Sequence, residues 1–169
     1  PIKFEIFKEF FENLTASFER RDIIFHVIYD YASFLADEYE LNCISCKPEE
    51  LIKNEYDYLI SLGGDGTVLD TLALVKDSGI PVVGINLGRL GFLASIQMSE
   101  CDIAIEAMVA KQLVIEKRSV LQLISDNNLI NTFPFALNDF VVQKRDRSAM
   151  ILVLSSVENL QPVQFKACN

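Results

Sequence analysis

The sequence has little of what marks secreted, membrane-spanning or nucleic-acid-binding proteins. Its 169 residues include only four cysteines and one histidine, and no apolar run approaches the roughly 20 residues that cross a bilayer. Fifteen basic residues against 24 acidic ones give a formal charge of −9. That balance argues against a nucleic-acid or anionic-membrane surface, because such surfaces are built from clustered Lys and Arg. The negative net charge does not exclude a small anionic ligand, since such a ligand needs only a local positive site.

The start of the chain and its few cysteines predict a reducing, cytoplasmic location without a signal peptide. The first residue is Pro1 rather than Met, and we expect residues to be missing at both ends. Cys43 and Cys46 form a C-x-x-C pair that suits redox chemistry or half of a zinc site, but no second close pair of ligands exists, so ordinary thiols are favoured. The single histidine, His26, lies in an apolar run, which leaves a Ser/His or Cys/His nucleophilic site almost without support.

Helical and strand patterns alternate over the first two thirds of the chain. Apolar residues at spacings of three and four predict an amphipathic helix over residues 4–20. Strands are predicted at 23–29, 58–62 and 82–85, with a weak one at 41–46, and further helices at 30–35 (capped by Asp30), from Pro48, from Gly66 to Asp77 and at 100–110. This alternation predicts an α/β domain over residues 1–112, with a parallel sheet covered by helices on both faces.

The pattern changes after residue 112. Residues 120–124 alternate between apolar and polar side chains, residues 151–154 form a short apolar run, and turn-forming residues separate such stretches. Little helical periodicity remains. We therefore predict the beginning of a second, all-β domain over residues 113–169, cut short at its end.

A glycine-rich loop follows the strand predicted at 58–62. Residues 62–67 read Leu-Gly-Gly-Asp-Gly-Thr, and a helix follows them. Ligands of open α/β sheets bind at such strand ends, where backbone N–H groups and the helix start attract phosphate. Asp65 would repel an anion there unless it holds Mg²⁺ or takes a proton from an attacking hydroxyl. A plain turn is the alternative, less favoured because of the doubled glycine and the following Thr. The predicted phosphate loop consists of Gly63, Gly64, Gly66 and Thr67.

A second such loop follows the next strand. Residues 86–93 read Asn-Leu-Gly-Arg-Leu-Gly-Phe-Leu, and we expect both loops to open on the same edge of the sheet. Arg89 offers a charge for a phosphate, and Phe92 offers a flat apolar face for a base. The alternative is that Phe92 and Leu93 belong to the core.

A third segment, residues 136–142, places Asn138 and Asp139 in an apolar stretch. Such polar groups are costly to bury unless they are satisfied, and paired acceptors suit the two hydroxyls of a ribose; a turn or bulge is the alternative. The basic run 144–147 is a solvated hairpin tip or a phosphate contact, and residues 117–119 likewise serve an anion or only the surface. No acidic pair stands out as a metal site.

On these three segments the chain resembles the NAD kinase family, also called inorganic polyphosphate/ATP-NAD kinases. The first motif is shared with diacylglycerol, sphingosine and phosphofructokinase-type kinases, whereas the second is close to diagnostic, and all three occur in the family's order over about residues 20–157. The resemblance implies a Rossmann-like N-terminal domain, a C-terminal β domain, and NAD bound between them. Two departures are that Asp139 stands where many members carry Glu, and that the family's later Asp-Gly and Thr-Pro-Thr-Gly-Ser-Thr-Ala-Tyr-like stretches are not reached.

The resemblance also implies roles for individual residues. Asp65 would be the catalytic carboxylate, activating the 2′-hydroxyl of the adenosine ribose of NAD for attack on the γ-phosphate of ATP or on polyphosphate. The implied substrate-binding residues are Gly64, Gly66, Leu69, Arg89, Phe92, Asn138 and Asp139. Family members need a divalent metal, usually Mg²⁺, and assemble as homo-oligomers, either dimers or tetramers.

Two other functions stay open on the sequence alone. One is a dinucleotide-binding module without turnover, favoured for the 169-residue piece if it is inactive by itself. The other is a lipid kinase of the diacylglycerol or sphingosine type, which would need a membrane-facing basic or apolar patch that the charge of −9 does not favour. Asp65 discriminates between binding and transfer, because NAD binding alone needs no carboxylate beside the phosphates.

Overall fold

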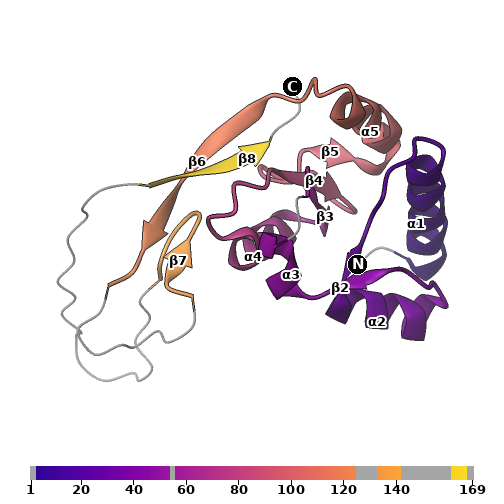
Figure 1. The fold of residues 1–169 in the computed structure, drawn as a ribbon, viewed down its shortest axis with the longest axis horizontal. Helices are drawn as coiled ribbons and strands as arrows, with labels where there is room; N and C mark the ends of the chain where they lie inside the picture. The colour runs from indigo at the N-terminus through magenta and orange to yellow at the C-terminus, as the bar shows by residue number, and fades with distance from the viewer. Residues whose placement is uncertain (1–2, 54–55, 125–132, 142–160, 167–169) are drawn as a thin grey trace.

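A computed structural model describes residues 3–53, 56–124, 133–141 and 161–166 (Figure 1). The helices are α1 (Phe4–Glu19), α2 (Tyr29–Tyr39), α3 (Pro48–Lys53), α4 (Asp65–Val75) and α5 (Cys101–Val109), with a 3-10 turn at Met98–Glu100. The strands are β1 (Val27–Ile28), β2 (Ser45–Cys46), β3 (Leu59–Gly63), β4 (Val82–Asn86), β5 (Ile96–Gln97), β6 (Ile115–Gln122), β7 (Phe135–Ala136) and β8 (Gln161–Lys166). The predicted α/β class is confirmed.

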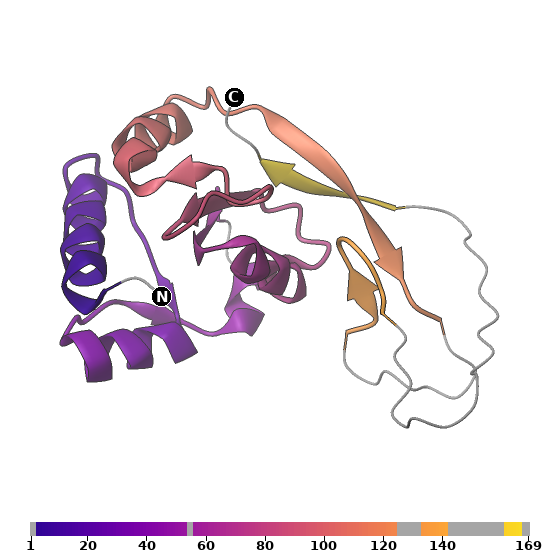
Figure 2. The same cartoon turned by 180° about the vertical axis from the view of Figure 1, so that it is seen from behind.

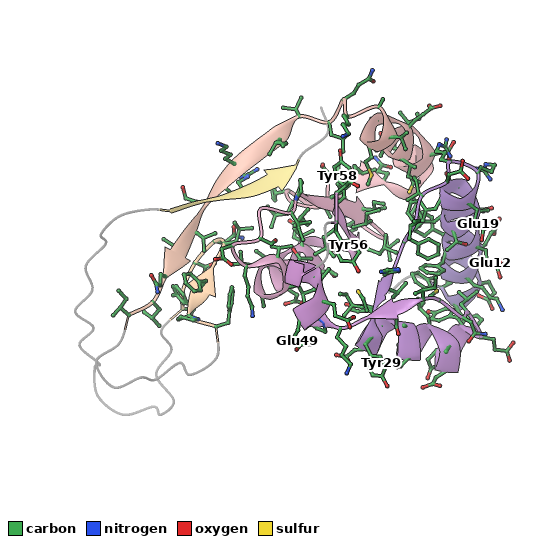
Figure 3. All side chains as sticks on the ribbon, in the orientation of Figure 1. Glu12, Glu19, Tyr29, Glu49, Tyr56 and Tyr58 are labelled. Atoms are coloured by element: carbon green, nitrogen blue, oxygen red, sulfur yellow. The ribbon has the colours of Figure 1, made fainter. Side chains whose placement is uncertain are left out.

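Helix α1 forms where the apolar spacing predicted it. Phe11, Leu14 and Phe18 are buried along one face of the helix, while Glu12 and Glu19 project from the face turned away from the sheet (Figure 3). The first turn packs differently, because Phe4 is 46% exposed and stacks on Tyr39 of α2, with 4.5 Å between ring centroids. The periodic pattern therefore identified the helix and most of its buried face.

The predicted strand at 23–29 is largely wrong. Only Val27 and Ile28 are in a strand, and Ile24 is 84% exposed. The reason is that β1 pairs only with β2, in a separate two-stranded parallel sheet. His26 is accordingly not a core residue: it is exposed, and its Nδ1 lies 2.8 Å from the hydroxyl oxygen of Tyr56, which Figure 3 labels.

Two predicted helix starts also shift. The helix expected from Asp30 begins at Tyr29, with Ile28 at its N-cap and no side-chain cap, so Asp30 lies in the first turn instead. The helix expected after Gly66 begins at Asp65, with Gly64 as N-cap. The second shift matters for the site, because it places the Asp65 side chain on the first helical residue.

The main sheet has the order β3-β4-β8-β6-β7, with β5 beside β4. β3, β5 and β8 all pair with β4 in parallel, whereas β6 pairs antiparallel with β7 and β8. In both cartoon views α1 and α2 lie at one end of the molecule and β6 and β7 at the other (Figures 1 and 2). The sheet thus continues past residue 112, and a separate all-β domain over 113–169 stays a prediction.

Strand β4 lies at the centre of two hydrophobic layers. All five of its residues are buried, and because side chains alternate along a strand they serve both faces. Val83 and Ile85 join the layer formed by α1 and α5, and Val82 joins the layer formed by α4 and Val120 of β6. Helices therefore cover both faces of the β3–β4 pair, as the alternation predicted.

Other sequence-based predictions concern groups outside the sheet. Cys43, Cys46 and Cys101 are free thiols, and the ordinary-thiol interpretation of the C-x-x-C pair stays a prediction. Within the described ranges no cluster of three or more metal-binding side chains occurs. None of the helices in that same part of the chain is long and apolar enough to pass through a bilayer.

Candidate functional site

The two glycine-rich loops lie side by side at the carboxyl edge of the sheet. β3 and β4 run parallel in register as far as the pair Gly63 and Asn86. One step beyond, the backbone N–H of Leu87 donates to the carbonyl oxygen of Gly63 at 3.0 Å. The prediction that both loops open on the same edge is therefore confirmed, and the reason is the parallel pairing of the strands that carry them.

The carboxylate of Asp65 joins the two loops. Its Oδ2 accepts the backbone N–H of Phe92 at 2.8 Å. Its Oδ1 accepts those of Leu93 at 2.8 Å and Ala94 at 3.0 Å. Three main-chain donors of the second loop thus fix the orientation of the side chain that the first loop supplies.

These donors also govern the charge of Asp65. The hydrogen bonds from the N–H groups of Ala94 and Phe92 lower the pKa of the Asp65 carboxyl below its ordinary value, against a smaller opposing effect of desolvation, and the N–H of Leu93 adds to the lowering. N–H donors favour the ionised form because they stabilise the negative oxygen atoms. At neutral pH the candidate site therefore carries a fixed carboxylate.

Two of the loop glycines are required by close contacts. A β-carbon on Gly91 would overlap the Asp65 carboxylate, and one on Gly63 would overlap the Thr67 side chain. By contrast, a β-carbon on Gly64 or Gly66 would meet nothing within 4 Å. The backbone around Gly64 and Gly66 is thus open at the beginning of α4, where a helix start presents unpaired N–H groups.

The remaining first-loop residues lie on α4. Thr67 is half-buried beside Gly63, and Leu69 is half-buried two residues further along. Val68, between them, is buried in the α4 layer of the core. Val68 therefore packs this part of α4 against the core, and Thr67 and Leu69 are its neighbours in the helix.

Asn86 organises the second loop, a role that our sequence analysis did not assign to it. Its side chain is buried, with 3% exposed. The Oδ1 atom accepts the N–H of Gly88 at 2.7 Å, and Nδ2 donates to the carbonyl oxygens of Arg89 at 2.6 Å and Ala94 at 3.4 Å. The available signal was an amide side chain ending a strand that is otherwise apolar, since a buried amide needs partners.

The exposed residues of the second loop differ in their packing. Phe92 is 95% exposed, so it is not a core residue. Leu93 is partly buried and packs against the α4 layer, as the core alternative proposed for it. Arg89 is exposed, and it forms no salt bridge with any described residue. The loop thus presents an aromatic face and a cation to solvent.

The third segment lies against the same helix as the first loop. Leu137 and Phe133 pack against the α4 layer, which places β7 beside α4 (Figure 1). Asn138 and Asp139 follow directly and are exposed. Within the described ranges no hydrogen bond joins either side chain to the two loops.

The basic segment at 117–119 lies on β6. Arg118 pairs with Glu116 on its own strand, Nη2 to Oε1 at 2.8 Å, which favours the surface alternative for residues 117–119. The basic run at 144–147 lies outside the described residues.

The architecture defines an α/β protein with a carboxylate at the meeting point of two glycine-rich loops. Residues 29–113, about half of the chain, match the family model described as the ATP-NAD kinase N-terminal domain. The chain belongs to the NAD kinase family.

Curated relatives agree with this assignment. The NAD kinase of Bacteroides fragilis is 37% identical over 144 residues, which cover 83% of this chain and 49% of the relative. The NAD kinase of Heliobacterium modesticaldum is 47% identical over 105 residues, covering 61% of this chain and 37% of the relative. The chain thus spans about half the length or less of the curated relatives that it matches. None of this supports the lipid-kinase alternative.

A solved structure shares the fold. The yeast NADH kinase, solved in complex with NADH, superposes with a TM-score of 0.58 at 19% identity, over 76% of this chain and 41% of that one. At that identity the likeness concerns the fold, and it agrees with the predicted α/β architecture.

Proposed function

We propose that this protein is a NAD kinase that transfers the γ-phosphate of ATP to the 2′-hydroxyl of the adenosine ribose of NAD, which gives NADP. The observation that carries the proposal is the Asp65 carboxylate, held by three backbone N–H groups between the two glycine-rich loops. Family membership supports the same reaction. The donor named in the family description is ATP, and polyphosphate remains the alternative donor.

In this proposal Asp65 takes the proton of the ribose hydroxyl as the hydroxyl oxygen bonds to the γ-phosphorus, and the bond from that phosphorus to the bridging oxygen of ATP breaks so that ADP leaves. Oδ2 accepts one N–H and Oδ1 accepts two, so Oδ2 keeps a lone pair for the hydroxyl. A carboxylate with a lowered pKa is a weak base, so it orients the hydroxyl before the reaction and accepts its proton only as the new oxygen–phosphorus bond forms. That suits phosphoryl transfer, in which positioning and charge stabilisation supply most of the catalysis.

The substrate-binding roles follow the exposed groups. The open backbone at Gly64 and Gly66 would face phosphate, together with Gly63 and Thr67 of the same loop. Phe92 and Leu69 would line the adenosine, and Arg89 would contact a phosphate. The exposed Asn138 and Asp139 would hold ribose hydroxyls.

The divalent metal is also part of the proposal. No cluster of three or more metal-binding side chains occurs within the described ranges. Mg²⁺ held mainly by nucleotide phosphates and water, its usual mode of binding, needs no such cluster. The metal would neutralise charge on the phosphates. We further propose a cytoplasmic homo-oligomer, a dimer or tetramer, on the family resemblance alone.

A second candidate function is dinucleotide binding without turnover. One observation favours it. The Asp65 carboxylate already accepts hydrogen bonds from three backbone N–H groups, and it therefore has a structural role in holding the second loop.

The deciding experiment is NADP formation by protein expressed from the complete gene, given NAD, ATP and Mg²⁺, with a diacylglycerol assay in parallel. NADP formation is the expected result. NAD binding without NADP would establish the binding module instead, and the absence of both would reopen the lipid-kinase alternative.

A further inference from the structure

Asn86 links the end of the central strand to both ends of the second loop. Its Oδ1 accepts the N–H of Gly88 at 2.7 Å, and its Nδ2 donates to the carbonyl oxygen of Arg89 at 2.6 Å, both at the loop's beginning. The second Nδ2 donation, 3.4 Å long, reaches the carbonyl oxygen of Ala94 at the loop's end. Both N–H bonds of the amide and one acceptor position are thereby used.

Ala94 carries the connection onward to the carboxylate. Its carbonyl oxygen accepts from Asn86, while its backbone N–H donates to Oδ1 of Asp65 at 3.0 Å. The neighbouring N–H groups of Phe92 and Leu93 donate to the same carboxylate. A continuous path of hydrogen bonds therefore runs from the core side chain of Asn86 to the oxygen atoms of Asp65.

We propose that Asn86 is a positioning residue for phosphoryl transfer, because its buried amide shapes the second loop so that the loop's backbone N–H groups hold the Asp65 carboxylate. This inference rests on the proposed function. Three related side chains would not reproduce the arrangement at position 86: Asp lacks the two donors, Leu lacks all polar atoms, and Gln is longer by one methylene group.

The proposal has a consequence for the titration of Asp65. If the loop relaxes, the carboxylate loses N–H donors, and its pKa moves up towards the ordinary value. The other charged groups on the elements around it are Asp70 of α4, Arg89 of the loop and Asp139 after β7. Arg89 is the one cation among these three groups, and it forms no salt bridge to Asp65 in the part of the chain that the structure describes.

The test compares wild type, Asn86→Ala and a matched control in protein expressed from the complete gene. The control is Thr71→Ala on α4, which likewise removes a buried polar group (5% exposed) whose hydroxyl bonds to Val68 at 2.6 Å, within the helix and away from the loop. Steady-state kinetics with NAD, ATP and Mg²⁺ are measured across pH, and melting temperatures report the loss of stability. Asn86→Ser, neutral but too short to reach both loop ends, serves if Asn86→Ala does not fold.

For Asn86→Ala we expect kcat to fall on the order of a hundredfold, as misplaced catalytic groups do, with the KM values for NAD and ATP changed by no more than about threefold. The acid limb of the pH–kcat profile should move to higher pH. The control should lose stability but keep its kcat and its pH profile.

The inference would be overturned if wild type forms NADP while the acid limb of the Asn86 variants stays in place, or if their kcat falls no more than that of Thr71→Ala. A wild-type protein that forms no NADP would instead overturn the proposed function, which separates the two failures.

Discussion

Gly91 lies against the carboxylate of Asp65 so closely that a β-carbon at residue 91 would overlap the carboxylate oxygens. The two residues belong to different loops, and their contact lets the carboxylate reach the N–H groups of Phe92, Leu93 and Ala94. There is thus no room for a side chain at residue 91, and the geometry of the candidate site depends on glycine at this position.

Gly91→Ala should therefore lower the free energy of unfolding by about 1–3 kcal/mol, the usual cost of overpacking. Gly88→Ala is the matched control in the same loop, because its β-carbon would meet only the Asn86 Oδ1 atom, at 3.9 Å. The control should be neutral or stabilising by about 0.4–1 kcal/mol. Urea denaturation measures both, and equal losses would contradict the contact described here.

Asp65→Asn should abolish NADP formation while NAD binding stays within about tenfold, since an amide cannot accept the hydroxyl proton. One oxygen of the Asn side chain can still accept N–H groups, but its NH₂ group would face another donor. Coupled NADP assays and calorimetry provide the two measurements. Near-normal turnover of the variant would remove Asp65 from the catalytic role.

The pH dependence of stability should differ between wild type and Asp65→Asn. Because the folded-state pKa of Asp65 is lowered, its contribution is fully present above the unfolded value of about 3.9 and is lost as pH falls through the folded value. The stability advantage of wild type should therefore shrink below about pH 4. Among the described residues Asp102 is the other carboxyl with a lowered pKa, and it is present in both proteins, so its effect cancels in the comparison.

Urea midpoints measured on both proteins from neutral to acidic pH would show this difference. Parallel curves would mean that the N–H groups of the second loop do not stabilise the carboxylate.

Phe92→Ala should leave stability within about 0.5 kcal/mol, as surface substitutions do, because the ring is 95% exposed. It should weaken NAD binding by about 1 kcal/mol through loss of stacking. Leu93→Ala is the contrasting variant, since Leu93 packs against the core and its truncation should cost more stability. Lost stability with unchanged NAD affinity in Phe92→Ala would argue against a base-binding role.

Asn138→Ala should weaken NAD binding by about 1–3 kcal/mol, the cost of leaving a polar ligand group without its partner. Val141→Ala, at a position that is 78% exposed in the same segment, is the control and should bind NAD normally. Calorimetry measures the NAD affinity of both variants, and unchanged affinity in Asn138→Ala would exclude the ribose contact.

Local patterns predicted the parts of the fold that depend on local physics. The helix at α1 followed from its periodic apolar residues, and the meeting of the two loops followed from parallel strands ending in glycine-rich sequences. The run at 23–29 was misread because its composition suits a buried strand, whereas its pairing with β2 extends only over Val27 and Ile28. Strand partners are chosen by long-range packing, which composition alone does not reveal.

The candidate site was predicted as a set of side chains and found to depend on the backbone. The donors to Asp65 are main-chain N–H groups. Any residue except proline provides such a group, so the residue types in the sequence do not identify these donors. Asn86 was missed for a related reason, because its partners are carbonyl and N–H groups of its own loop.

The hydrogen bond from the Leu87 N–H to the Gly63 carbonyl oxygen extends the β3–β4 ladder by one step. Because this bond involves only main-chain atoms, the spacing between the two loops does not depend on which side chain stands at residue 87, with proline as the exception. Exposed positions such as Gly66, Leu90 and Phe92 can accordingly change during evolution, or in a design experiment, without altering that spacing. Ligand preference is thus free to diverge on a scaffold that stays the same.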